Sequence, residues 1–133
     1  MYSAYYSFLC MPSLRSLSRG LLALLFIGAG VLHFVAPATY LRIMPPYLPE
    51  PLLLVYLSGA AEIAGGLGLL LPATRRVAGW GLLALLIAVF PANVYMLQTH
   101  GAGLAVPQWA LWLRLPLQAV LMAWVWRSAR RQR

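Results

Sequence analysis

Four long apolar stretches dominate the pattern of hydrophobic and polar positions along this chain. The hydrocarbon core of a bilayer is about 30 Å thick, so a helix that crosses it needs about 20 mostly apolar residues. Prolines, glycines or arginines bound each stretch, and a backbone inside lipid must satisfy its own hydrogen bonds by being helical. The pattern therefore predicts an all-α transmembrane four-helix bundle, with helices at about residues 17–35, 52–71, 77–97 and 108–126.

Basic residues collect on one side of the four predicted helices. They precede the first helix, occupy the turn between the second and third, and follow the fourth: Arg15, Arg19, Arg75, Arg76, Arg127, Arg130, Arg131 and Arg133. The connections on the other side hold only Arg42 and Glu50 in one and His100 in the other. Cytoplasmic loops of membrane proteins carry an excess of basic residues. The asymmetry predicts a multi-pass protein of the cell (inner) membrane with both termini cytoplasmic.

These boundaries divide the chain into three parts. Residues 1–16 are expected to form a mobile cytoplasmic N-terminus, residues 17–126 the transmembrane domain, and residues 127–133 a basic cytoplasmic tail. Basic residues before an apolar stretch are also typical of a signal peptide. Because three further apolar stretches follow, we interpret the first one as an uncleaved anchor.

Composition excludes a soluble domain. Of the 133 residues 62% are hydrophobic and only 9% are charged, whereas a soluble domain has about 25% charged residues. The formal net charge of +8 follows from arginines that flank apolar stretches, so we expect lipid as the partner and no nucleic acid. Cys10 is the single cysteine, which rules out an intramolecular disulfide or a dithiol centre.

Polar residues inside the predicted helices are candidates for function, because a charge at mid-membrane costs about 2.5–3.5 kcal/mol on insertion scales. Glu62 and Arg114 differ in depth by about 6 Å at 1.5 Å per residue, so we predict that they pair. The outer halves of the four helices together supply one candidate buried polar or ligand site: His33, Glu62, Asn93, Arg114 and Gln118.

Three interpretations of this cluster stay open. It could be a structural network that fixes which helices meet, a site for a ligand such as a quinone, or a proton or redox relay. No metal site is predicted, because the two histidines, His33 and His100, have no Cys or Asp nearby. Catalytic residues are not assigned.

A proline-rich segment, residues 37–51, connects the first two predicted transmembrane helices. Its prolines prevent a long helix, and its apolar residues would not lie free in water. We therefore predict a short structured cap over the outer mouth of the bundle, with an ordinary interfacial connector as the alternative. The cap residues are Tyr40, Met44, Pro45 and Pro46.

Several short motifs occur in order over about residues 20–126: Gly30-Val-Leu-His33-Phe34, Pro37, Tyr40, Met44-Pro45-Pro46, Ser58-Gly59-x-x-Glu62, Gly65-Gly66, Leu71-Pro72, Arg75-Arg76, Phe90-Pro91-Ala92-Asn93 and Trp112-Leu113-Arg114-Leu115-Pro116-Leu117-Gln118. As a set they resemble the DoxX family of four-helix membrane proteins. The resemblance implies a four-helix bundle and a link to redox systems, since the namesake is linked to thiosulfate:quinone oxidoreductase.

From these observations we expect an accessory or quinone-linked subunit of a membrane oxidoreductase system. The sequence assigns no cofactor; a quinone is the candidate for the cofactor, and a redox protein is the candidate for the partner. The absence of a dithiol means that any thiol oxidation would need that partner. One alternative is a non-enzymatic membrane assembly factor or chaperone. Another is small-molecule transport, for which four short helices leave little room unless the chain forms an oligomer.

Overall fold

The computed structural model describes residues 13–130, which contain five helices and no strand. The helices are α1 (Leu14–Val35), α2 (Pro37–Arg42), α3 (Pro51–Leu70), α4 (Arg75–Gln98) and α5 (Gln108–Ala129). The all-α prediction is confirmed, and the four long helices lie within three residues of their predicted bounds. The short helix α2 falls in the proline-rich segment, where no helix was assigned.

Local chemistry explains where these helices begin and end. The hydroxyl of Ser13 accepts a hydrogen bond from the backbone N–H of Ser16 at 3.2 Å, so α1 begins earlier than predicted. Residues 1–12 lie outside the described residues, as do residues 131–133 of the predicted basic tail. Pro37 and Pro51 occupy the first positions of α2 and α3, where a proline has no hydrogen bond to lose. Ala36 leaves the helical region, as residues before proline do, and so ends α1.

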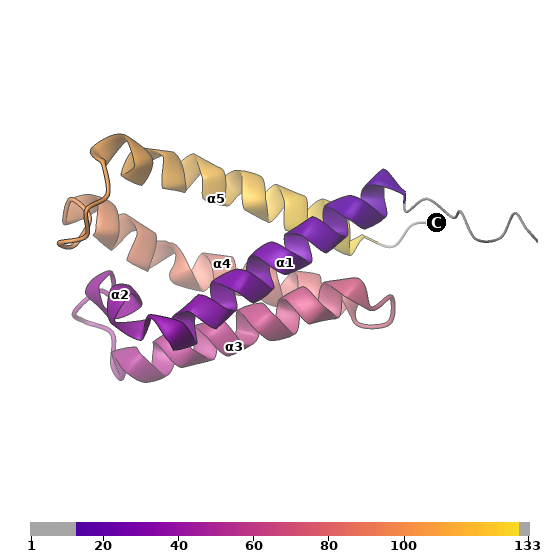
Figure 1. Cartoon of the computed structure of the whole chain (residues 1–133), viewed down its shortest axis with the longest axis horizontal. Helices are drawn as coiled ribbons and strands as arrows, with labels where there is room; N and C mark the ends of the chain where they lie inside the picture. Colours follow the sequence, from indigo (N-terminus) through magenta and orange to yellow (C-terminus); the bar gives the residue numbers. More distant parts are fainter. Residues whose placement is uncertain (1–12, 131–133) are drawn as a thin grey trace, which may run out of the picture.

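The long helices pack side by side in the order α1, α3, α4, α5, and α1 makes a further, slight contact with α5. The start of α1, the α3–α4 turn and the end of α5 lie together at one end of the molecule (Figure 1). We call this the arginine end, because Arg15, Arg76 and Arg130 lie in or next to these segments. The helix α2 and the α4–α5 loop lie at the opposite end, here called the α2 end.

The apolar core is formed near the arginine end by residues from all four long helices: Leu22, Phe26, Leu69, Leu82, Leu86 and Val125. The outside of the helices is apolar as well, with Leu24 67% and Ile87 62% exposed. Large apolar surfaces of this kind are typical of proteins that face lipid. Helices α1, α3 and α4 are each long and apolar enough to cross a membrane. Helix α5 is not among them, since its middle carries Arg114 and Gln118.

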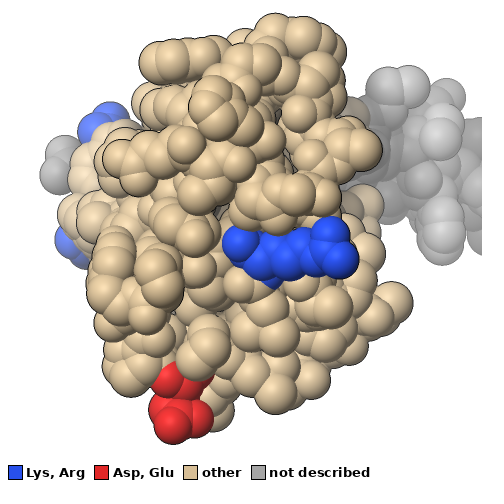
Figure 2. Space-filling model, turned by 90° about the vertical axis from the view of Figure 1, so that its left-hand side faces the viewer, with Lys and Arg blue, Asp and Glu red and all other residues tan. Residues whose placement is uncertain are grey.

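Charge is distributed unevenly between the two ends. Figure 2 shows the α2 end, where most of the surface is uncharged. Arg42 and Glu50 are exposed in the connection between α1 and α3. The folded chain thus keeps the separation of basic residues that the order of the sequence implied.

Candidate functional site

Glycines bring α1 and α3 into direct backbone contact near the α2 end. A Cβ added at Gly59 would lie 2.6 Å from the Cβ of His33 and 2.8 Å from the carbonyl oxygen of Gly30. Only a residue without a side chain fits such an approach. Gly66, about two turns further along α3, also lies against the backbone of α1. This contact carries His33 of α1 to the side of Glu62 of α3.

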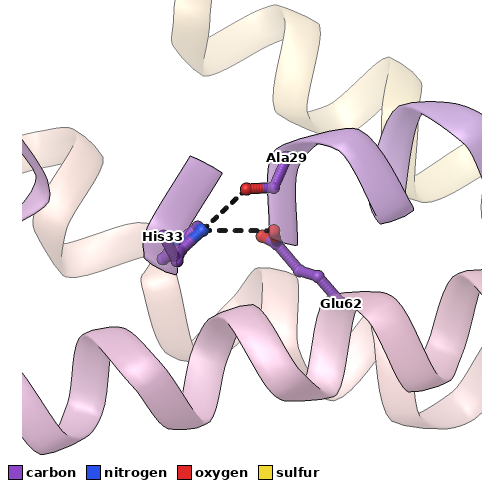
Figure 3. Close-up of polar contacts among 3 residues, drawn as sticks. All are labelled: Ala29, His33 and Glu62. Atoms are coloured by element: carbon purple, nitrogen blue, oxygen red, sulfur yellow. Dashed lines mark hydrogen bonds and ion pairs between the residues drawn. The ribbon is translucent and has the colours of Figure 1, made fainter. Parts of the chain in front are cut away.

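His33 and Glu62 form the central pair of the site (Figure 3). The Nδ1 atom of His33 lies 2.9 Å from the carbonyl oxygen of Ala29, one turn earlier in α1, and 3.5 Å from Oε2 of Glu62. A carbonyl oxygen can only accept, so Nδ1 carries a hydrogen and donates it to Ala29. The His33 and Glu62 side chains are only 9% and 13% exposed.

One consequence is a buried carboxylate oxygen with no hydrogen bond. The single hydrogen on Nδ1 of His33 is used within α1, and Oε2 of Glu62 has no other donor among residues 13–130. A buried acceptor left in this state costs about 1–3 kcal/mol, and more when it is charged. Glu62 therefore has an unused capacity to accept a hydrogen bond.

Tyr40 of α2 covers this pair from one side. Its ring stacks on the imidazole of His33, with ring centroids 3.8 Å apart and 24° between the planes. Burial raises the pKa of the Tyr40 hydroxyl, the negative charge of Glu62 raises it further, and the positive charge of Arg114 lowers it. We call His33, Tyr40 and Glu62 the His–Glu–Tyr cluster. Within the described part of the chain, no group of three His, Cys, Asp or Glu residues could hold a metal ion.

The predicted pairing of Glu62 with Arg114 is wrong. Among residues 13–130, the ion-pair contact of Glu62 is with His33, and Arg114 is exposed on α5. Helix α5, which carries Arg114, packs on α4 and only slightly on α1. Glu62 points the other way, toward α1, because its face of α3 carries the glycine contact. The charge of Arg114 lowers the pKa of the Tyr40 hydroxyl, and Arg114 has no ion pair with Glu62 among residues 13–130.

Asn93 and Gln118 form a second, separate polar pair between α4 and α5. The Asn93 amide donates to Oε1 of Gln118 at 2.8 Å, and Nε2 of Gln118 donates to the carbonyl oxygen of Leu86 at 2.5 Å. The five predicted residues are thus divided between the His33–Glu62 contact, the hydrogen-bonded Asn93–Gln118 pair and the exposed Arg114.

The segment predicted as a cap folds back on the bundle. Pro45 is fully buried, Met44 is half-buried and Pro46 is exposed. The guanidinium of Arg42 donates to the carbonyl oxygen of Gly103 at 3.5 Å, which links α2 to the α4–α5 loop. Tyr40 is the cap residue that reaches the His–Glu–Tyr cluster.

Fold and site together have the features of a small helical membrane protein with a buried polar pair between two of its helices. A family model covers residues 22–129, and the chain belongs to that family, a domain of unknown function named DUF8561. The resemblance to the DoxX family is therefore a wrong prediction. Comparison with curated proteins and with solved structures gives no match.

Proposed function

We propose that the protein crosses the cell (inner) membrane four times, with both termini in the cytoplasm. Helix α5 has 22 residues, so it is about 33 Å long and long enough for the hydrocarbon core. It packs beside the apolar helix α4, and its Trp112 and Val120 are each 61% exposed, as lipid-facing residues would be. The arginine end would face the cytoplasm under the positive-inside rule.

Cysteine labelling tests this topology. In a Cys10→Ser background, single cysteines are placed at Ala73 in the α3–α4 turn, Ala105 in the α4–α5 loop and Arg127 near the end of α5. A membrane-impermeant maleimide should label only the Ala105 position in right-side-out vesicles, and all three after permeabilisation. Labelling of the Arg127 position from outside would show that α5 does not cross.

For the His–Glu–Tyr cluster we infer a binding site for the head group of a lipid-soluble, quinone-type molecule. The observation that carries this is the buried Oε2 of Glu62, which lacks a hydrogen-bond donor. The hydroxyl group of a quinol would supply that donor. A quinol is lipid-soluble, so it would reach the site through the membrane. Carboxylate and imidazole are also the usual proton acceptors in proteins, so Glu62 and His33 could take up a proton from the bound hydroxyl.

The role that follows is an accessory, quinone-linked subunit of a membrane oxidoreductase system. The chain's own residues would bind the head group and hold a proton. Electrons would pass to a redox partner protein, because one cysteine, Cys10, cannot supply a dithiol centre. Support for this role comes from the site alone, since the family has no assigned activity.

A binding titration with a short-chain quinol in detergent micelles tests the inference, with native mass spectrometry to detect bound quinone. Glu62→Gln removes the charge of the acceptor and should weaken quinol binding about tenfold or more, because hydrogen bonds to charged groups contribute about 1.5–3 kcal/mol. Glu50→Gln is the matched control, as Glu50 is the other acidic residue and is exposed. Equal affinity of both variants for the quinol would contradict a site at Glu62.

A membrane assembly factor is the second candidate, and one observation favours it. A Cβ added at Gly28 of α1 or at Gly81 of α4 would meet nothing within 4 Å, so these positions could admit a partner helix. In that case Gly28→Leu would reduce the recovery of a partner from native membranes, and Glu62→Gln would not. The opposite result would favour the quinone-linked role.

A further inference from the structure

A cavity of about 230 Å³ opens between α4 and α5 at the arginine end. The residues that line it include two arginines, two tryptophans and two small or apolar residues: Arg76, Trp80, Leu83, Trp126, Ala129 and Arg130. It is separate from the His–Glu–Tyr cluster, with which it shares no residue. Its walls combine the positive charge of two arginines with apolar side chains.

Small residues explain why this cavity forms. Gly79 of α4 lies directly against Ala129 of α5, so the two backbones meet at that point. On one side of this contact the rings of Trp80 and Trp126 meet edge to face, with centroids 5.1 Å apart and 76° between the planes. The tryptophan rings thus form one wall of the cavity. The space beside them stays open because Gly79 and Ala129 are too small to fill it.

The arginines hold their charge at the mouth of the cavity. Cζ of Arg130 lies 4.7 Å from the centroid of the Trp126 ring, a cation–π contact that orients the guanidinium. Arg76 and Arg130 are both exposed, and neither has an ion-pair partner within residues 13–130. Two guanidinium groups with free N–H donors match the oxygens of a phosphate, which arginine binds through paired hydrogen bonds.

We propose that this cavity binds an anionic phospholipid of the cytoplasmic leaflet. Arg76 and Arg130 would bind the lipid phosphate, while Trp80 and Leu83 contact the glycerol and the start of the acyl chains. Trp80 is 54% exposed, and tryptophan is enriched at the depth of the lipid head groups. Basic pockets between membrane helices on the cytoplasmic side suit such head groups. This rests on the proposed membrane placement and not on the quinone site.

Native mass spectrometry of the detergent-purified chain tests the proposal with phosphatidylglycerol, phosphatidylcholine and inorganic phosphate as separate additions. We expect phosphatidylglycerol to bind more tightly than phosphatidylcholine. Arg76→Gln and Arg130→Gln should each weaken phosphatidylglycerol binding about fivefold, and the double variant about 25-fold. Arg15→Gln is the control, because Arg15 is exposed at the same end but does not line the cavity. It should change the affinity less than twofold.

Three results would overturn the proposal. An equal loss in Arg15→Gln would mean that only the overall charge matters. Displacement of the lipid by millimolar inorganic phosphate would indicate a site for free phosphate, and equal binding of phosphatidylcholine would remove the requirement for an anionic lipid. The quinol titration uses Glu62→Gln and the lipid measurement uses the arginine variants. A negative result in one of these experiments therefore does not affect the conclusion from the other.

Discussion

Replacement of Gly59 by alanine tests whether direct backbone contact holds α3 against α1. The new Cβ would lie 2.6 Å from the Cβ of His33 and 2.8 Å from the carbonyl oxygen of Gly30. Carbon atoms in contact are normally about 3.5–4.0 Å apart, so the two helices must separate by about 1 Å. Neither contacting atom belongs to the flexible end of a side chain. Such overpacking is expected to destabilise the fold by about 1–3 kcal/mol.

Gly28→Ala provides the matched control for this prediction. Its added Cβ would meet nothing within 4 Å, and both variants remove the penalty of about 1 kcal/mol that glycine carries inside a helix. The difference between the two variants therefore measures the steric effect alone. We expect Gly59→Ala to be less stable than Gly28→Ala by about 1–3 kcal/mol.

Equilibrium unfolding by sodium dodecyl sulfate in mixed micelles, followed by circular dichroism, measures both free energies of unfolding. If the free energies of unfolding of the two variants agree to within about 0.5 kcal/mol, the added Cβ at Gly59 has no steric effect. The glycine contact then does not hold the helices together. The position of Glu62 against His33 would then need another explanation.

Two further predictions use the same unfolding assay. Gln118→Leu should destabilise the fold by about 0.6–2 kcal/mol, because it removes an interhelical hydrogen bond and leaves Asn93 without its partner. Once Gln118 is replaced, Asn93→Leu should cause little further loss of stability. If the effects of the two substitutions were fully additive, the pairing would be contradicted. In double-mutant cycles, Glu62→Gln should be coupled to His33→Phe by about 0.5 kcal/mol or more and additive with Arg114→Gln within about 0.3–0.5 kcal/mol. Coupling to Arg114 instead would restore the rejected pair.

The positions of the long helices could be predicted because two local signals agree. Apolar length fixes how far a membrane helix extends, and Pro51 marks where α3 begins. The rotation of each helix about its axis could not be predicted in the same way. Glu62 faces α1 because Gly59 contacts Gly30 across the interface, and this depends on which helices are neighbours.

The stack of Tyr40 on His33 was missed for a related reason. Tyr40 was assigned to the cap from its place in the proline-rich segment, but nothing in the sequence states how the segment turns back. The hydrogen bond from His33 to Ala29 joins residues four positions apart in α1. Every residue in a helix has a carbonyl group at that spacing, so the sequence does not indicate this bond.

The mistaken family resemblance also has a physical cause. Its motifs consist largely of glycines where helices pack closely, prolines and arginines at helix ends, and isolated polar residues within the helices. Any small bundle of membrane helices needs such residues for packing and orientation. Their order along the chain therefore reflects the architecture and does not distinguish one family from another.

The two polar pairs in this protein provide an internal comparison that bears on which of them is a site. A polar network whose role is to fix helix contacts is most favourable when each member is satisfied. Asn93 and Gln118 meet that condition, since Gln118 both accepts from Asn93 and donates to the Leu86 carbonyl. Glu62 does not, because its buried Oε2 has no hydrogen-bond donor among residues 13–130. The structural interpretation therefore fits the α4–α5 pair, and the unsatisfied carboxylate between α1 and α3 is the better candidate for binding a ligand or a proton.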